Sequence, residues 1–132
     1  MKRALVIISA LVLLASALLA GCGGGKAATT YTDPTQAINL KPNQEFVIAL
    51  QANPTTGYDW QPVFDAGLIS QVKKDYQQDD HSGQPIVGSG GTDFFTFKAT
   101  KAGQGKVTFT YFRPWEAPKA EDKQLTFNLN IK

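Results

Sequence analysis

The sequence predicts an all-β fold, an immunoglobulin-like antiparallel β-sandwich of about seven strands. Apolar and polar residues alternate with a period of two along several short segments, as in strands that bury one face. Turn residues separate these segments, and no stretch after the apolar N-terminus has a convincing helical period. A partly closed barrel is the structural alternative.

Residues 1–21 predict a bacterial lipoprotein signal peptide. The basic pair Lys2-Arg3 precedes an uncharged apolar run at 4–19, which is short and is followed by glycines instead of a basic stop. These features favour a cleaved signal over a spanning helix. The residues LAGC resemble the lipoprotein box, in which Cys22 becomes the acylated N-terminus. A plain cleaved signal with an incidental cysteine is the alternative.

The composition of the mature chain bounds its partners and its stability. Cys22 is the single cysteine, so no disulfide can form. Without Lys2 and Arg3, eleven basic residues remain against eleven acidic ones, so the net charge is about zero and no nucleic-acid partner is expected. Residues 22–35 are rich in Gly, Thr and Ala and predict a flexible tether. Residues 36–132 then form one domain, which is expected to be monomeric.

The strands follow from the alternation. The clearest lies near the C-terminus, where Leu125, Phe127, Leu129 and Ile131 alternate with polar residues. The predicted strands are 36–40, 45–51, 58–64, 68–77, 92–100, 105–113 and 124–131. Within 58–64, Tyr58 and Trp60 are expected to share the inward, core-facing side.

The connections divide into two sets. Alternate loops of such a sandwich lie at the same end, because each strand runs back against the previous one. Brief turns occupy one end, at 41–44, 65–67 and 101–104. The other end holds loops of unusual composition, at 53–57, 78–91 and 113–123.

The sequence NPTTG predicts a narrow, stiff loop. Asn53 precedes proline and should be extended, and Pro54 has a fixed φ. Thr55 and Thr56 are stiff at χ1. Gly57 can take a positive φ. Taken alone, this loop is better explained as an ordinary turn.

The other two loops offer different contact chemistry. The residues Gly88-Ser89-Gly90-Gly91 expose backbone groups to which a partner's main chain could pair, with plain flexibility as the alternative. Phosphate binding is disfavoured because no helix follows. Arg113-Pro114-Trp115 combines a stiffened backbone with the residue types most enriched at interface hot spots. The alternative is that Trp115 folds back over the rim of the core.

Catalysis is disfavoured. His81 is the lone histidine, and Ser82 is its sequence neighbour, not a facing nucleophile. Asp79 and Asp80 beside it make at most a weak cation site, and a solvated charge cluster is the better interpretation. No metal-ligand spacing is present, so no enzyme activity, metal or cofactor is expected.

The three loop motifs together resemble a known family. NPTTGY at 53–58, GSGG at 88–91 and RPW at 113–115 are similar to the motifs of the chagasin-like inhibitors of papain-family cysteine peptidases. Order and approximate spacing match, and the resemblance covers about residues 36–132. It implies an immunoglobulin-like sandwich without disulfides and reversible, occluding inhibition of papain-like (clan CA) cysteine peptidases.

The resemblance also implies how each loop acts. The segment 53–58 would enter the catalytic cleft, with Thr55 and Thr56 nearest the catalytic cysteine. The segment 88–91 would pair by its backbone on the non-primed side. Arg113 and Trp115 would contact the primed side, with Trp115 packing on an aromatic of the peptidase. The implied peptidase-binding residues are Asn53, Pro54, Thr55, Thr56, Gly57, Tyr58, Gly88, Ser89, Gly90, Gly91, Arg113, Pro114 and Trp115.

Other interpretations use the same loop end. An envelope adhesin or a ligand-binding immunoglobulin-like module would bind through these loops without affecting a peptidase, as would a structural lipoprotein with an envelope partner. In each case Cys22 predicts a lipid-anchored protein of the cell envelope. Gly23 stands where Asp typically signals inner-membrane retention in Gram-negative lipoproteins, so the outer membrane or its periplasmic face is favoured if the source is Gram-negative.

Overall fold

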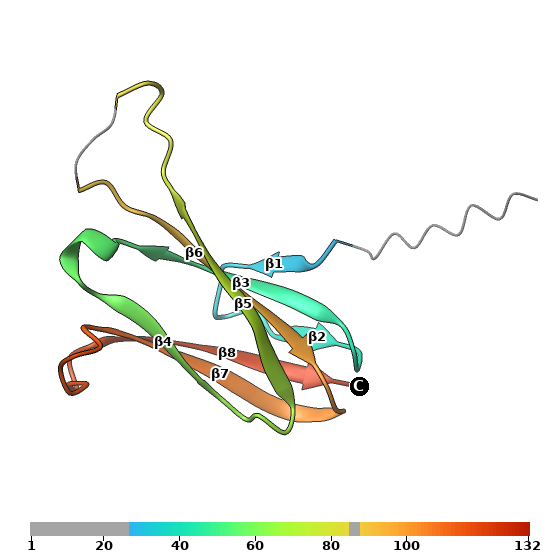
Figure 1. The fold of residues 1–132 in the computed structure, drawn as a ribbon. Helices are drawn as coiled ribbons and strands as arrows, with labels where there is room; N and C mark the ends of the chain where they lie inside the picture. Colours follow the sequence, from blue (N-terminus) through green and yellow to red (C-terminus); the bar gives the residue numbers. More distant parts are fainter. Residues whose placement is uncertain (1–26, 85–87) are drawn as a thin grey trace, which may run out of the picture.

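The computed structural model describes residues 27–84 and 88–132, which form a two-layer β-sandwich (Figure 1). One sheet has the strand order β1-β3-β6-β5 and the other β2-β8-β7-β4. The elements are β1 (Thr29–Tyr31), β2 (Ile38–Leu40), β3 (Glu45–Ala52), the 3₁₀ turn η1 (Pro54–Thr56), β4 (Asp59–Phe64), β5 (Ile69–Gln78), β6 (Gly91–Ala99), β7 (Gly103–Phe112) and β8 (Lys123–Ile131). The predicted sandwich is confirmed, and its seven predicted strands correspond to β2 to β8.

The predicted signal peptide, 1–21, and Cys22 lie outside the described residues. In the part of the chain that the structure describes, no helix is long and apolar enough to cross a membrane.

The start of the domain differs from the prediction in two ways. β1 pairs with β3 in parallel, and β2 pairs with β8 in parallel, so the sandwich is not purely antiparallel. β1 also falls within 22–35, which was predicted as tether, and its Tyr31 packs against the core. The tether prediction is therefore wrong for Thr29–Tyr31. A strand of three residues buries too few side chains to show an alternating pattern.

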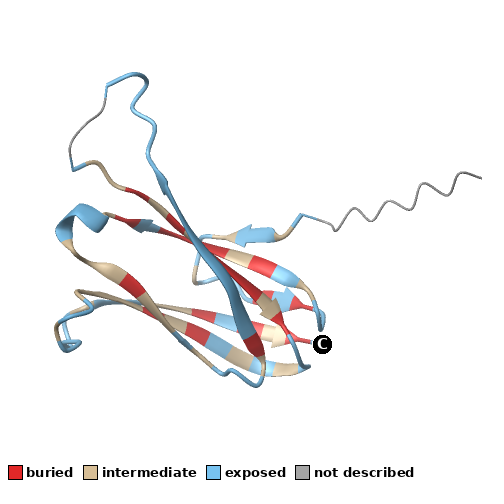
Figure 2. Ribbon diagram, viewed as in Figure 1, coloured by how far each residue is buried: buried red, intermediate tan, exposed pale blue. Residues whose placement is uncertain are grey.

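The core is aromatic and lies between the sheets. Buried residues follow the inner faces of both layers, whereas β5 is exposed along nearly its whole length (Figure 2). The largest fully buried side chains are Trp60, Phe46, Phe95, Phe97, Phe109 and Phe127. Rings such as Trp60 and Phe109 meet edge to face, with centroids 6.4 Å apart. Each aromatic side chain buries about 150–250 Å², which gives the loops a firm base without a disulfide.

β5 and β4 are edge strands on the same open side of the sandwich. β5 is interrupted by a bulge between Gln71 and Lys73 and carries the ion pair of Lys73 with Asp75. Bulges and charged side chains are devices that keep an exposed edge from pairing with another chain. The bulge and the charged side chains therefore protect the edge of β5, although Val72 and Tyr76 on this strand are exposed.

The two ends of the sandwich differ as the alternation of loops predicts. At one end, which we call the turn end, backbone hydrogen bonds join the connections 41–44, 65–68 and 100–102. Asn43 donates to Ala99 at 2.7 Å, and Thr100 donates to Leu68 at 2.9 Å. The opposite end, which we call the loop end, carries the loops 53–58, 79–90 and 113–122 (left in Figure 1).

Candidate functional site

Asn53 organises the β3–β4 loop. Its backbone is extended (φ −137°, ψ 90°), as expected before proline, and its side-chain Oδ1 accepts the N–H of Thr55 at 3.2 Å. Its carbonyl oxygen accepts both the N–H of Thr56, at 3.2 Å, and the hydroxyl of Thr56, at 2.7 Å. One asparagine therefore closes η1 from both its side chain and its main chain.

Gly57 ends the turn under two constraints. Its φ of 80° is in the left-handed region, and its N–H donates to the carbonyl of Pro54 at 3.0 Å. A Cβ at this position would lie 2.5 Å from Cη2 of Trp115, so the indole rests directly on the glycine. Backbone conformation and ring contact both require the residue to be glycine, and the predicted positive φ is confirmed.

The three motifs meet at the loop end. The side-chain Nδ2 of Asn53 donates to the carbonyl of Gly88 at 3.1 Å, which joins the first motif to the second. Nε of Arg113 donates to the carbonyl of Thr56 at 3.3 Å, which joins the first motif to the third. The β3–β4 loop is therefore the middle of one continuous surface, with the β5–β6 and β7–β8 loops on its two sides.

Trp115 is the most exposed large hydrophobic side chain among the described residues of this surface, at 71%. It contacts Gly57 with its ring and does not fold back over the core rim, so the alternative stated above is excluded. An indole left in water on a stiff loop is typical of an interface anchor.

Arg113 and Tyr58 pack against each other at the same end of the sandwich. The guanidinium of Arg113 lies 5.0 Å from the centroid of the Tyr58 ring, and its Nη1 lies 3.5 Å from Oε1 of Glu116. Trp60 is buried in the core at 2% exposure, as predicted, but Tyr58 is half-buried. The prediction that Tyr58 is a core residue is therefore wrong: it precedes β4 and packs at the rim of the core, between Arg113 and Tyr111.

Tyr111 is a residue of this site that the sequence reasoning missed. Its hydroxyl accepts the backbone N–H of Asn53 at 2.9 Å, and its ring lies 4.7 Å from that of Trp60. It therefore ties the first residue of the loop to the buried core. Its place on the predicted strand next to the RPW motif was the one available signal, and that signal does not separate a hydrogen-bonding tyrosine from an ordinary core aromatic.

The glycine-rich motif divides into a loop part and a strand part. Gly88 has a φ of 83°, and among the described residues no atom beyond its chain neighbours lies within 4 Å of where its Cβ would be. The carbonyl of Gly90 accepts the N–H of Asp79 at 3.1 Å. Ser89 receives a hydrogen bond from Gln78. Gly91, by contrast, is buried in β6, where a Cβ would lie 2.3 Å from the carbonyl oxygen of Gln77. The prediction that Gly91 exposes its backbone is therefore wrong, because strand packing occupies that position.

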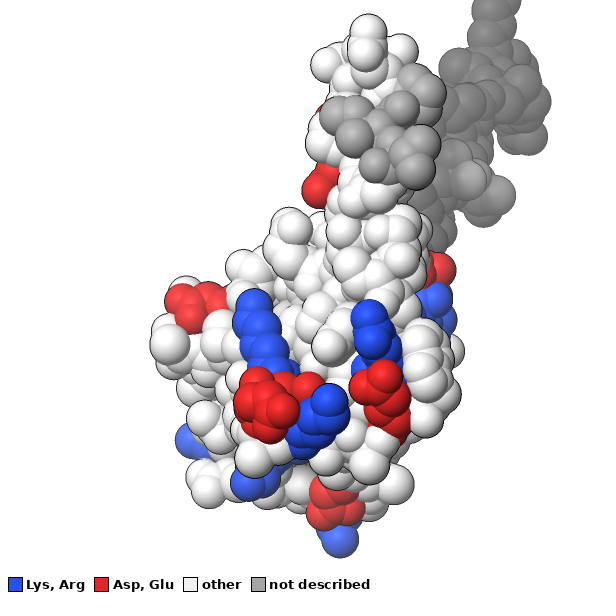
Figure 3. All heavy atoms as spheres, turned by 90° about the vertical axis from the view of Figure 1, so that its left-hand side faces the viewer, with Lys and Arg blue, Asp and Glu red and all other residues white. Residues whose placement is uncertain are grey.

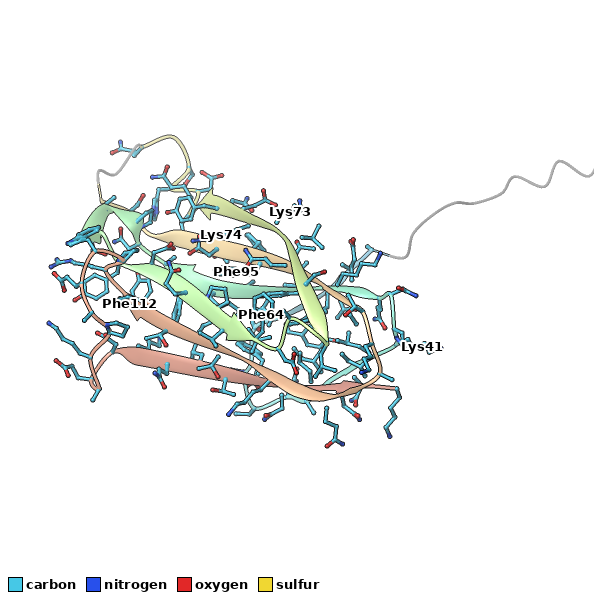
Figure 4. All side chains as sticks on the ribbon, turned by 60° about the horizontal axis from the view of Figure 1, so that its bottom comes forward. Lys41, Phe64, Lys73, Lys74, Phe95 and Phe112 are labelled. Carbon is cyan, nitrogen blue, oxygen red and sulfur yellow. The ribbon has the colours of Figure 1, made fainter. Side chains whose placement is uncertain are left out.

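A charged cluster closes the open side of the sandwich below the β3–β4 loop. Lys74 forms ion pairs with Asp59 and, at 3.6 Å, with Asp93, and its Nζ lies 5.2 Å from the Phe95 ring (Figure 4). Asp93 is 4% exposed, and this burial raises the pKa of its carboxyl, an effect that the nearby Lys74 cation partly offsets. A pocket of about 360 Å³ lies beside the cluster. Its lining residues are Ala52, Pro54, Tyr58, Asp59, Lys74, Tyr76 and Asp93.

The residues predicted as a weak cation site are exposed and lie in the β5–β6 loop. The N–H of Ser82 donates to the carboxylate of Asp80 at 2.8 Å, so this carboxylate organises its own turn. Within residues 27–84 and 88–132, no three His, Cys, Asp or Glu side chains gather where they would hold a metal ion. On the loop end as a whole, basic and acidic side chains lie next to each other, and much of the remaining surface is uncharged (Figure 3).

Comparison with known proteins agrees with this geometry. The family model described as Chagasin family peptidase inhibitor I42 matches residues 39–131. The chain is 36% identical over 103 residues to Amoebiasin-1 from Entamoeba histolytica, an alignment that covers 78% of this chain and 97% of the relative. It is 33% identical over 89 residues to Chagasin from Trypanosoma cruzi, covering 62% of this chain and 76% of the relative.

Solved structures with the same fold include the solution structure of Amebosin, with a TM-score of 0.64 and 31% identity over 80% of this chain and 98% of the other. The crystal structure of a cysteine protease inhibitor from Entamoeba histolytica is similar with a TM-score of 0.67 and 25% identity, over 80% of this chain and 96% of the other.

Proposed function

The chain belongs to the chagasin family of peptidase inhibitors, and from this premise we propose that it reversibly inhibits papain-like cysteine peptidases by occluding their active-site cleft. One observation carries the proposal. The three loop motifs form a single surface, because Asn53 bonds to Gly88, Arg113 bonds to Thr56, and Trp115 lies on Gly57. A surface of this kind can fill a cleft and contact both of its walls at once.

The β3–β4 loop is the part that we place in the cleft, with Thr55 and Thr56 nearest the catalytic cysteine. A peptidase attacks a carbonyl that the bound chain presents in line with the thiolate. Here the segment forms a 3₁₀ turn, and the carbonyls of Asn53, Pro54 and Thr56 already accept hydrogen bonds within the protein. The loop therefore fills the site without offering an extended backbone for attack.

The flanking loops are assigned to the two sides of the cleft. The indole of Trp115, stiffened by Pro114, supplies the exposed aromatic anchor on one side. On the other side, Gly88 is exposed and has no side chain, so a partner's backbone can approach it closely. Arg113 has an internal role as well, since it holds the carbonyl of Thr56 and covers the ring of Tyr58.

Preorganisation is the physical basis of the affinity that we expect. A loop that must become ordered on binding loses part of its interaction energy, about 0.5–1.5 kcal/mol for each immobilised side chain. In this protein the loop is already held by Asn53 and by the hydroxyl of Tyr111, which is packed on the core. Little ordering is left for the complex, so an interface of ordinary size can bind tightly.

The proposal includes the membrane anchor. We infer that the lipid on Cys22 holds the monomeric inhibitor in the cell envelope, at the outer membrane if the source has one. The motif LAGC, the position of the single cysteine and the apolar run before it support this inference. Two or more acyl chains make such an anchor stable.

The function is tested by titrating a soluble chain that starts after Cys22 into papain with a small fluorogenic substrate. We expect reversible inhibition that approaches one inhibitor per enzyme. Trp115→Ala should raise the inhibition constant at least tenfold, about 1.4 kcal/mol. Val63→Ala is the matched control, because Val63 is 69% exposed but lies on β4 and outside the three loops.

No inhibition at micromolar concentration would refute the proposal and leave binding without inhibition, as in an adhesin. Inhibition that Trp115→Ala does not weaken would refute the assignment of the loops.

A further inference from the structure

The N-terminal strand determines where the chain leaves the domain. β1 runs parallel to β3, and its first residue, Thr29, is paired with Phe46, near the start of β3. β3 runs from the turn end toward the β3–β4 loop. The chain that precedes Thr29 therefore enters at the turn end, on the far side of the sandwich from the three motif loops (right in Figure 1).

The segment between the proposed anchor at Cys22 and the start of β1 at Thr29 is short. From Cys22 to Thr29 a fully extended chain spans at most about 25 Å. The part of β3 from Phe46 to Ala52 already spans about 20 Å, and the motif loops extend beyond it. For the loop end to contact the membrane, the segment 22–29 would have to be fully extended along the side of the domain. Full extension costs a Gly-rich segment conformational entropy.

The turn end also has a charge that suits an anionic surface. It carries more lysines than acidic residues, whereas the motif loops carry more acidic residues than basic ones. At the turn end these residues are Lys41, Lys98, Lys101 and Lys132, against Glu45 and Asp65. The acidic loop residues are Asp79, Asp80, Glu116, Glu121 and Asp122, against Arg113 and Lys119. Although the net charge is near zero, positive charge is therefore in excess at the turn end and negative charge at the loop end.

A hollow of about 250 Å³ at the turn end lies beside two of these lysines. It is lined by Asn39, Leu40, Lys41, Gln44, Asn130 and Lys132. The amide of Asn130 donates to Oδ1 of Asn39 at 3.1 Å, and Oε1 of Gln44 accepts the N–H of Lys41 at 3.0 Å. Lys41 and Lys132 line the same hollow, and their ammonium groups suit a phosphate oxygen.

The geometry points to the turn end as a membrane-facing surface, which binds the phosphates of anionic lipids beside the acylated Cys22. The three motif loops then project away from the bilayer. This assignment rests on the proposed anchor and extends the proposed function: the inhibitor is oriented toward peptidases that approach from the aqueous side. A peptidase embedded in the same membrane surface would not reach the loops.

The test uses the full acylated chain in phosphatidylglycerol vesicles and two matched single-residue reporters. Ala102→Cys at the turn end and Ala120→Cys in the β7–β8 loop are both exposed alanines, and acylated Cys22 has no thiol to compete for the fluorophore. Spin-labelled lipid headgroups should quench the reporter at 102 at least threefold more than the reporter at 120. Equal quenching, or stronger quenching at 120, would overturn the orientation.

A second arm tests the lipid contact. In phosphatidylcholine vesicles the quenching at 102 should weaken, and Lys41→Gln with Lys132→Gln should remove the difference between the two lipids. Each lysine near an anionic surface changes binding about fivefold. The control pair, Lys73→Gln with Lys106→Gln, removes the same charge from the middle of the sheets and should preserve the difference. Equal quenching in both lipids with the unmodified lysines would overturn the phosphate contact.

Failure of this inference is separable from failure of the proposals beneath it. Mass spectrometry of the purified chain reports whether Cys22 is acylated, and papain titration in detergent reports whether the chain inhibits. A chain that is acylated and inhibitory but shows the opposite quenching pattern overturns the orientation alone.

Discussion

Gly57 and Trp115 depend on each other, because the ring of the tryptophan lies where any side chain at 57 would begin. Gly57→Ala introduces a Cβ 2.5 Å from Cη2 of Trp115 at a φ of 80°. We expect a loss of about 1 kcal/mol in the free energy of unfolding from the left-handed backbone. We also expect a rise of tenfold or more in the inhibition constant for papain, because the anchor and the loop are displaced.

The control for this prediction is Gly83→Ala. Gly83 also has a positive φ, 88°, but in the part of the chain that the structure describes no atom beyond its chain neighbours lies within 4 Å of its would-be Cβ. It should lose similar stability and keep its inhibition constant. An equal change in inhibition for both variants would show that backbone strain, and not the contact with Trp115, explains the effect.

Tyr111 links the core to the β3–β4 loop, because its ring packs against Trp60 and its hydroxyl accepts the N–H of Asn53. Tyr111→Phe removes the acceptor for the N–H of Asn53 and leaves that donor half-buried without its partner. We expect about 1 kcal/mol of lost stability and a several-fold rise in the inhibition constant, mainly through faster dissociation. Stopped-flow dissociation from papain measures this, and an unchanged dissociation rate would remove Tyr111 from the positioning role.

The buried carboxyl of Asp93 makes the free energy of unfolding depend on pH. Its pKa is raised above the usual value near 3.8, mainly by burial. At pH values between the usual pKa and the raised one, the folded state therefore holds a proton that the unfolded state has released. The free energy of unfolding therefore falls as the pH rises through the folded pKa. We expect Asp93→Asn to be more stable than the wild type at pH 7, with the difference shrinking toward pH 4.

Urea unfolding at several pH values, followed by the fluorescence of buried Trp60, measures this difference. Asp75→Asn is the control, because Asp75 is paired with Lys73 on the exposed strand and is expected to change little. A less stable Asp93→Asn at pH 7 would show that the ion pair with Lys74 outweighs the cost of burial.

At the scale of elements, β1 converts part of an apparent tether into structure. Tyr31 packs against the core, while Thr30 beside it is exposed. We expect Tyr31→Ala to lower the free energy of unfolding by about 1–2 kcal/mol through lost apolar burial. Thr30→Ala should change it by less than about 0.5 kcal/mol. Equal, negligible effects in urea unfolding would mean that β1 does not contribute to the domain.

The parallel pairing of β1 also has a consequence for orientation. An antiparallel strand at the same edge would bring the chain in at the loop end, beside the surface that we assign to the peptidase. The parallel register of Thr29 with Phe46 places the entry point at the turn end instead. The direction of three residues thus determines which end of the domain a lipid anchor would hold close to the membrane.

At the scale of the whole molecule, we propose that acylation of Cys22 determines where the inhibitor is found. With acylation, the chain should fractionate with membranes and be released by detergent but not by high salt, since acyl chains insert in the hydrocarbon layer. Cys22→Ser should move it to the soluble fraction, with its inhibition constant for papain unchanged because the chain enters the domain at the turn end, away from the three loops. Continued membrane association of Cys22→Ser would point to an uncleaved N-terminal segment as the anchor.

Local sequence determined the elements and the motifs of this protein. The alternation in segments such as 124–131 identified seven strands, because the side-chain period of a half-buried strand is fixed by its geometry. The strand count then placed the three loops at one end. The conformations of Asn53 and Gly57 also followed from residue type, since proline restricts the residue before it and glycine tolerates a positive φ.

Tertiary structure decided what depends on contacts between distant residues. The ring of Trp115 on Gly57, the bond from Tyr111 to Asn53 and the burial of Gly91 join positions whose proximity no local pattern encodes. Tyr58 lies at the rim of the core and not inside it, because it packs against Arg113 and Tyr111, which are distant in the sequence. The alternation of apolar and polar residues predicts which face of a strand a residue occupies. Which residues it contacts depends on how the two sheets pack against each other.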